Sequence, residues 1–126
     1  MRKLIASGSS FEQFIGFSRA CRVGSTIAVS GTAPLDSDGE AVCSGDVYGQ
    51  TKRCLEISLN SIREAGGSLE GVIRTRIMLV EISEWKQAAK AHGEIFSQIK
   101  PACTFVEVKG FINSERLVET EMDCIV

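Results

Sequence analysis

Apolar and polar residues alternate along several short stretches of this chain, and apolar residues recur at helical spacing along two longer ones. Alternation places successive side chains on opposite faces of a strand, whereas spacings of three and four residues build one face of a helix. We expect a loop over residues 7–16 and a hairpin turn at 24–25. The predicted strands cover residues 3–6, 19–23, 26–30, 72–80, 102–108 and 117–125.

The longer predicted helix covers residues 47–65, with Asp46 as its N-cap and Gly66-Gly67 as its stop. Its apolar stripe consists of Thr51, Leu55, Leu59 and Ile62. A second helix is expected after Ser83 as its cap, and Pro101 prevents its continuation. The inner face of this helix carries Trp85, Ala88 or Ala89, His92, Phe96 and Ile99.

This order of elements predicts an α+β fold in which two helices cover one face of a mixed sheet. We expect the last two strands, joined by residues 110–116, to be antiparallel neighbours. Met78 and Phe105 are expected on the sheet's other face, which is then either solvated or covered by another subunit. The sequence thus favours a homo-oligomer, and its 126 residues are expected to form a single domain.

Charge, hydrophobicity and cysteine content limit the kinds of partner and the cellular compartment that we expect for this chain. The net charge is −2, and local basic patches such as Arg74 with Arg76 stay small, which argues against a nucleic-acid partner. No stretch is apolar enough for a membrane span, and the N-terminal residues lack the apolar region of a signal peptide. Five cysteines without CxxC spacing, and His92 as the only histidine, predict free thiols and no zinc site. We therefore expect a cytoplasmic protein.

Three motifs carry a family resemblance. Residues 30–34 read Ser-Gly-Thr-Ala-Pro, 101–108 read Pro-Ala-Cys-Thr-Phe-Val-Glu-Val, and 117–121 read Leu-Val-Glu-Thr-Glu. In this order and spacing the chain resembles the Rid family, also known as YjgF, RidA or endoribonuclease L-PSP-like proteins. The resemblance implies a chorismate-mutase-like fold and a homotrimer with clefts between subunits. It also implies hydrolysis of small enamine and imine acids, such as 2-aminoacrylate, with release of ammonia and without a metal or organic cofactor.

The family pattern is only partly kept. The arginine of the family's Pro-Ala-Arg is Cys103 here, and the cysteine two residues later is Phe105. A thiol cannot make the two parallel hydrogen bonds with which a guanidinium holds a substrate carboxylate. The chain is instead similar to a subgroup without that arginine, through Ser18-Arg19-Ala20, Ala91-His92-Gly93-Glu94 and Pro101-Ala102-Cys103-Thr104.

The resemblance assigns roles to particular residues. Glu121 matches a family carboxylate that lies beside the attacking water, and we expect Glu121 and His92 to be catalytic. The expected ligand contacts are Arg19, Ser30, Gly31, Cys103, Phe105 and Glu94, with Arg19 replacing the lost carboxylate clamp.

Plain structural roles compete with these assignments. Cys103 is otherwise an apolar filler, and Glu121 is one of several acids that pair with Arg74 and Arg76 across strands. His92 is otherwise a hydrogen-bonded packing residue, and Ser30 belongs to a turn.

Three functions remain open at this point. The first is a homotrimer that hydrolyses imine- or enamine-type metabolites. The second is a non-catalytic trimer that binds or senses a metabolite in the same cleft. The third is RNA cleavage, which the acidic balance and the lack of an aromatic, basic platform oppose. The expected partners are a small molecule and further copies of this chain.

Overall fold

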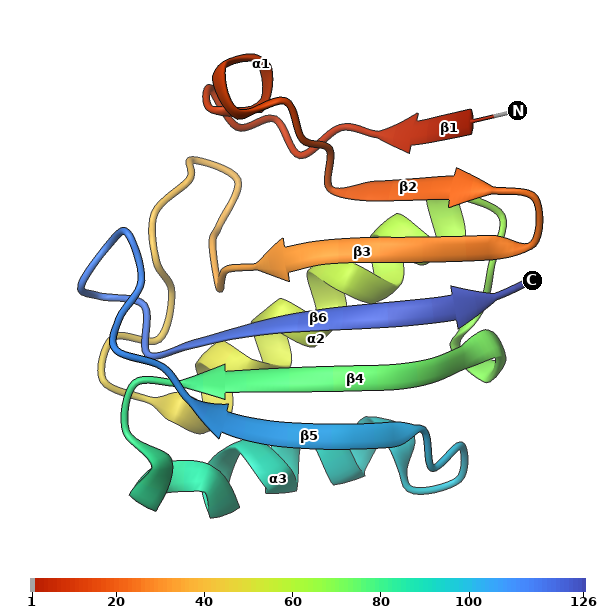
Figure 1. Ribbon diagram of the computed structural model, residues 1–126. Helices are drawn as coiled ribbons and strands as arrows, with labels where there is room; N and C mark the ends of the chain where they lie inside the picture. Colours follow the sequence, from red (N-terminus) through yellow and green to blue (C-terminus); the bar gives the residue numbers. More distant parts are fainter. Residues whose placement is uncertain (1) are drawn as a thin grey trace.

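The computed structural model describes residues 2–126, and its centre is a single mixed sheet. The strands lie in the order β1-β2-β3-β6-β4-β5 (Figure 1). They span Arg2–Ile5 (β1), Ala20–Val23 (β2), Thr26–Thr32 (β3), Val72–Leu79 (β4), Ala102–Glu107 (β5) and Val118–Ile125 (β6). The hairpin between β2 and β3 turns at Gly24 in the left-handed region, as predicted.

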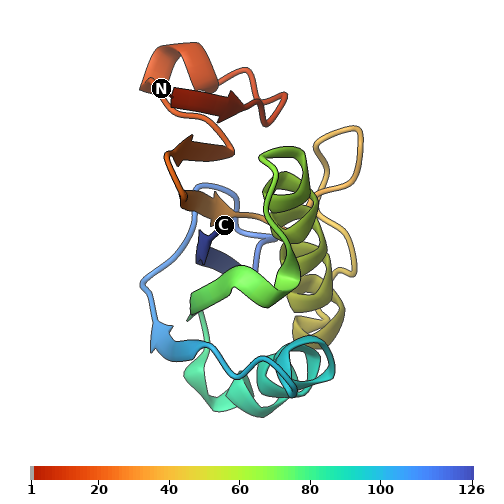
Figure 2. The same ribbon diagram turned by 90° about the vertical axis from the view of Figure 1, so that its right-hand side faces the viewer.

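Two helices, α2 (Val47–Glu64) and α3 (Trp85–Phe96), cover one face of this sheet and leave the other free of helices (Figure 2). This arrangement confirms the predicted α+β fold. One-turn helices occur at α1 (Glu12–Ile15), inside the predicted loop, and at η1 (Leu69–Gly71) and η2 (Ile82–Glu84). None of the helices within residues 2–126 has the length and apolar character needed to cross a membrane.

The apolar stripe of α2 explains its position. Thr51, Leu55, Leu59 and Ile62 are all buried against the sheet, and Gly66 follows the helix end with a φ of 93°. Such a φ favours glycine, because it lacks the Cβ that would clash. Ala88, Ala91 and Phe96 are the buried residues of α3, so helical periodicity places both helices.

The order of the last strands differs from the prediction. β5 does not contact β6 as an antiparallel neighbour; it pairs with β4 in parallel, at the edge of the sheet. The chain passes from β4 through α3 to β5, and such a helical crossover returns the chain in parallel. β6 lies between β3 and β4, antiparallel to both.

The parallel pairing also corrects the predicted direction of Phe105. Phe105 is in register with Ile77, which faces the helices, and its ring meets that of Trp85 edge-on with centroids 6.2 Å apart. Phe105 therefore packs on the helix side and not on the helix-free face. Met78 lies on the helix-free face with Arg74 and Arg76, because Thr75, Ile77 and Leu79 turn to the helices.

Candidate functional site

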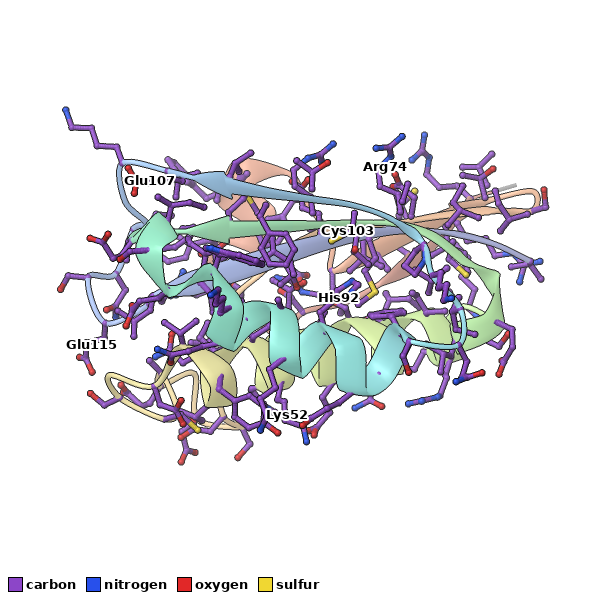
Figure 3. The ribbon with its side chains drawn as sticks, turned by 90° about the horizontal axis from the view of Figure 1, so that it is seen from below. Lys52, Arg74, His92, Cys103, Glu107 and Glu115 are labelled. Atoms are coloured by element: carbon purple, nitrogen blue, oxygen red, sulfur yellow. The ribbon has the colours of Figure 1, made fainter. Side chains whose placement is uncertain are left out.

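The edge strand β5 presents Cys103 on its helix-facing side. Cys103 is exposed and in register with Thr75, and Phe105 follows on the same side. Figure 3 shows Cys103 and His92 between the sheet and α3, with Arg74 pointing away on the opposite side of the sheet. The structure therefore brings together three of the predicted site residues, Cys103, Phe105 and His92, at one edge.

His92 is held in this edge by a specific hydrogen bond. Its Nε2 lies 2.8 Å from the Thr75 hydroxyl oxygen, and its ring stacks at a tilt on Phe96 with centroids 4.6 Å apart. Burial lowers the pKa of His92, because the imidazolium loses hydration between sheet and helix. The ring is therefore neutral at neutral pH, and its Nδ1 takes no part in the bond to Thr75.

Glu121 lies on the helix-free face, within a ladder of ion pairs between β4 and β6. Its carboxylate pairs with Arg76, and the next rung joins Arg74 to Asp123 with 3.7 Å between nitrogen and oxygen. These rungs follow the strand register, in which Arg76 is opposite Glu121. The predicted cross-strand pairing of Arg74 and Arg76 with the acids of the last strand is thus confirmed.

A shallow hollow of about 220 Å³ opens over this ladder. Its lining consists of Val29, Arg74, Arg76, Glu121, Met122 and Asp123. The hollow thus presents two carboxylates and two guanidinium groups, paired with one another, on the helix-free face.

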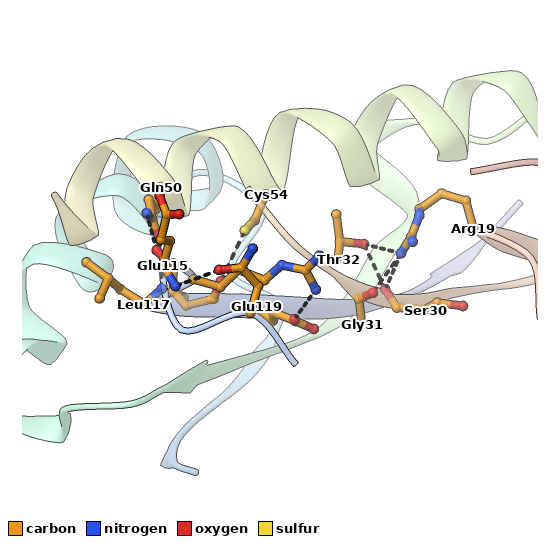
Figure 4. A network of polar contacts seen from close by, with 12 residues as sticks. Arg19, Ser30, Gly31, Thr32, Gln50, Cys54, Glu115, Leu117 and Glu119 are labelled. Carbon is orange, nitrogen blue, oxygen red and sulfur yellow. Dashed lines mark hydrogen bonds and ion pairs between the residues drawn. The ribbon is translucent and has the colours of Figure 1, made fainter. Parts of the chain in front are cut away.

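Arg19, Ser30 and Gly31 meet at the end of β3 (Figure 4). Nη1 of Arg19 donates to the Gly31 carbonyl at 2.7 Å, to the Thr32 hydroxyl at 3.0 Å and to the Ser30 carbonyl at 3.4 Å. The Ser30 hydroxyl donates to the carbonyl of Ser18 at 2.6 Å. Within one chain, these side chains stabilise the exit of β3, and β3, β6 and β4 separate Arg19 from Cys103.

Glu119 is a candidate that the sequence analysis missed. Its side chain is only 17% exposed and lies 3.5 Å from Arg116, whereas that of Glu121 is 37% exposed. Burial raises the pKa of Glu119, although Arg116 and Arg19 act in the opposite direction. Glu119, Glu121 and Asp123 occupy every second position of β6, so the sequence pattern does not tell them apart. Only the close approach of Gly31 and of the loop before β6 distinguishes Glu119 from the other two.

Glu94 lies apart from all of these groups. It accepts a hydrogen bond from the Tyr48 hydroxyl at 2.6 Å and pairs with Lys52 and Lys90 at 3.4 and 3.7 Å, on the outer side of the helices. Figure 3 shows Lys52 on the side of the helices away from the sheet. Within one chain, Glu94 is therefore a tie between α2 and α3.

The predicted residues thus fall into separate groups in a single chain. Cys103 and His92 lie at one edge, Glu121 lies on the opposite face, and Arg19 lies beyond three strands. Within residues 2–126, no three side chains of His, Cys, Asp or Glu gather closely enough to bind a metal ion.

Comparison with known proteins agrees with this fold. The endoribonuclease L-PSP family matches residues 8–126. An uncharacterized protein of Streptomyces coelicolor is 37% identical over 122 residues, which are 94% of this chain and 88% of that protein. The 3-aminoacrylate deaminase RutC of Acinetobacter baylyi is 31% identical over 79% of each chain.

Solved structures give the same result. The structure of a YjgF/YER057c/UK114 family member from Mycobacterium tuberculosis covers all of both chains with a TM-score of 0.89 and 36% identity. A putative endoribonuclease from Thermotoga maritima, at 24% identity, shares the fold with a TM-score of 0.83, covering 98% of this chain and 92% of that one. The chain belongs to the endoribonuclease L-PSP family, also known as the YjgF or Rid family.

Proposed function

We propose that this protein is a homotrimeric hydrolase of small imines or enamines, with its active clefts between neighbouring copies. The helix-free face supports this assembly, because it carries the half-buried Met78 and, at the far edge, the exposed Leu4, and because its charges already pair with one another. If a second copy covered that face, side chains that lie far apart within one chain would come together at the interface. Glu121 of one copy would then border the same cleft as Cys103 and His92 of the next.

The relative from Acinetobacter baylyi supports the reaction class, since its name assigns it the deamination of an enamine acid. In the proposed reaction, water adds to the imine carbon, and the Glu121 carboxylate accepts a proton from that water. The carboxyl group returns this proton to the nitrogen, which gives an amino alcohol. The carboxylate then moves the hydroxyl proton to the nitrogen, the carbon–nitrogen bond breaks, and ammonia and a carbonyl compound are released.

The observation that carries this proposal is the position of Glu121. A base must be held in place before water arrives, and the pairing with Arg76 fixes the position of the Glu121 carboxylate. The hollow beside Glu121 leaves space for water and a small substrate. The neutral imidazole of His92 would contact the substrate from the next copy, beside Cys103.

The replacement of the family arginine by Cys103 affects the substrate range. Because β5 offers no guanidinium there, we propose that the natural substrate binds without a carboxylate clamp from this strand. Phe105 lies two residues beyond Cys103 on the same side of β5, and Trp85 packs on Phe105, so these rings favour an apolar or neutral substituent near that position.

Ammonia release from freshly generated imines and enamines, both with and without a carboxylate, tests the reaction. We expect Glu121→Gln to lower kcat by a factor of about 100 or more, as for a missing general base. Asp123→Asn is the matched control, because it removes an acid from the same strand, face and ladder. Wild-type protein that releases no ammonia from any of these compounds would refute the reaction, as would an equal loss in both variants.

Two further measurements separate the alternatives. Light scattering that shows a stable monomer would remove every cleft between copies. The substitution by Cys103 favours a second candidate, a trimer that binds a metabolite without turnover. That candidate predicts saturable binding without ammonia release, whereas an activity that appears only in Cys103→Arg would mean that the clamp alone is missing. RNA cleavage, which the family's name suggests, requires binding of single-stranded RNA, and the net charge of −2 opposes it.

A further inference from the structure

A second hollow, which we name the Arg19 pocket, lies between the N-terminal strand and α2. It is an open hollow of about 230 Å³, lined by Ile5, Ala6, Ser7, Arg19, Arg53, Ile57, Asn60, Ser61 and Glu64. It shares no lining residue with the hollow over the ion-pair ladder. We propose that the Arg19 pocket binds a small carboxylate with a short apolar tail.

The first argument is the uncompensated charge of Arg19. Within residues 2–126, none of the ion pairs of 4.0 Å or less includes this guanidinium. Its bonded partners are carbonyl groups and a hydroxyl, all of them reached by Nη1. Glu119 and Glu12 act on it only from farther away, and burial lowers its pKa. A half-buried cation without a nearby anion is costly, and an anion in the pocket would remove that cost.

The second argument is the balance of charge around the pocket. Arg53 also lines it, and this side chain donates through Nε to the Leu35 carbonyl at 2.7 Å and pairs with Glu56. The Lys3 ammonium lies close by, bonded to the Glu64 carbonyl at 2.8 Å. Among the described residues that line the pocket, Glu64 is the only acid, against the two arginines Arg19 and Arg53, so positive charge prevails in the lining.

The third argument concerns the kind of anion. Ile5 and Ile57 give the pocket an apolar side, while Ser7, Ser61 and Asn60 supply polar groups. Ligand pockets usually measure about 300–1,000 Å³, so this one takes only a molecule of a few carbon atoms. Phosphate would leave the isoleucines uncovered, whereas the tail of a short carboxylate covers them. A guanidinium binds either oxyanion, so the apolar side decides between them.

This site is separate from the proposed catalytic cleft, and the two stand or fall independently. Glu121, His92 and Cys103, on which the proposed imine hydrolysis rests, do not line the Arg19 pocket. Butyrate binding should therefore be the same in wild type and in Glu121→Gln, whatever the outcome of the ammonia assay.

The test is an NMR titration of the full chain with sodium butyrate, with sodium chloride and sodium phosphate at matched ionic strength. We expect butyrate to cause saturable shifts of the Ser7 and Ser61 amides, with affinity in the millimolar range. Chloride and phosphate should bind more weakly. The absence of saturable shifts would overturn the proposal, and so would tighter binding of phosphate or chloride than of butyrate.

Paired surface variants add a test that does not disturb the bonds of Arg19. Asn60→Asp keeps the shape of an exposed side chain and adds a negative charge, so butyrate should bind roughly threefold to tenfold more weakly. Glu64→Gln removes a negative charge and should strengthen binding by a similar factor. Glu70→Gln, on η1 outside the pocket, is the matched control and should change nothing. Equal affinities in all of these variants would show that butyrate binds elsewhere.

Discussion

Gln50 offers the sharpest test of how the site is held in place. This side chain is fully buried at the start of α2, yet all of its bonds reach other segments. Its Nε2 donates to the carbonyls of Val42 and Glu115, each at 3.1 Å, and its Oε1 accepts from the Leu117 amide at 2.8 Å (Figure 4). Gln50 thus fastens two loops, including the one that leads into β6 with Glu119 and Glu121.

We expect Gln50→Ala to remove these three bonds and to leave their backbone partners unpaired. At about 1 kcal/mol net for each bond, the free energy of unfolding should fall by about 3 kcal/mol. With a urea m-value of about 2 kcal/mol per molar, the unfolding midpoint should fall by about 1.5 M. In hydrogen exchange, the Leu117 amide should lose protection before the strands do.

The matched control is Gln87→Ala, which truncates an exposed glutamine of α3 and should change stability by less than about 0.5 kcal/mol. A midpoint shift below about 0.5 M in Gln50→Ala, with an unchanged m-value, would refute the reasoning. It would mean that the loops keep their positions without this side chain.

Four further predictions concern single positions of the chain. Gly71→Ala should destabilise the fold by about 1–3 kcal/mol in urea, because a Cβ there would lie 2.2 Å from a carbonyl oxygen of β6. Gly93→Ala should stabilise it by about 0.5–1 kcal/mol, since a Cβ there meets no atom within 4 Å of the described chain. Burial lowers the pKa of His92, so the unfolded chain takes up its proton first and stability falls as the pH drops through the usual histidine range. In urea unfolding series at several pH values, His92→Gln should lack this part of the loss, and an unchanged pH dependence would contradict it. Iodoacetamide should label exposed Cys103 long before buried Cys54, whose pKa burial raises, and mass spectrometry of the native protein will show the order.

Much of the fold can be predicted from local sequence patterns, because burying one face of a helix or strand requires apolar residues at a regular spacing. The stripe from Thr51 to Ile62 places α2 correctly, and the alternation after Val72 places β4. The order of strands in the sheet depends on residues that are far apart in the sequence, so local patterns do not predict it. The alternating acids of β6, for example, are compatible with either an edge strand or a central strand. In the structure β6 lies in the middle of the sheet, paired with β3 on one side and with β4 on the other, where its acids meet Arg74 and Arg76.

The candidate site was less accessible to sequence reasoning. The position of Phe105 depends on the parallel register with β4, which alternation within β5 alone cannot reveal. Glu119 differs from Glu121 only in its surroundings, and Thr75 becomes important only through its bond to His92. The ion pair between Arg76 and Glu121 was accessible, because both residues belong to strongly alternating segments.

The close approach of Gly31 and Glu119 also has a consequence for how this sequence can change over time. Gly31 does not adopt a positive φ, yet a Cβ at this position would lie 3.3 Å from Oε1 of Glu119. The glycine is therefore favoured by its neighbour's carboxylate, which a Cβ would displace by a few tenths of an ångström, and not by its own backbone. Substitution at one position should depend on the residue at the other, so alanine becomes acceptable at position 31 once a shorter residue stands at position 119. Among homologues, the two positions should covary.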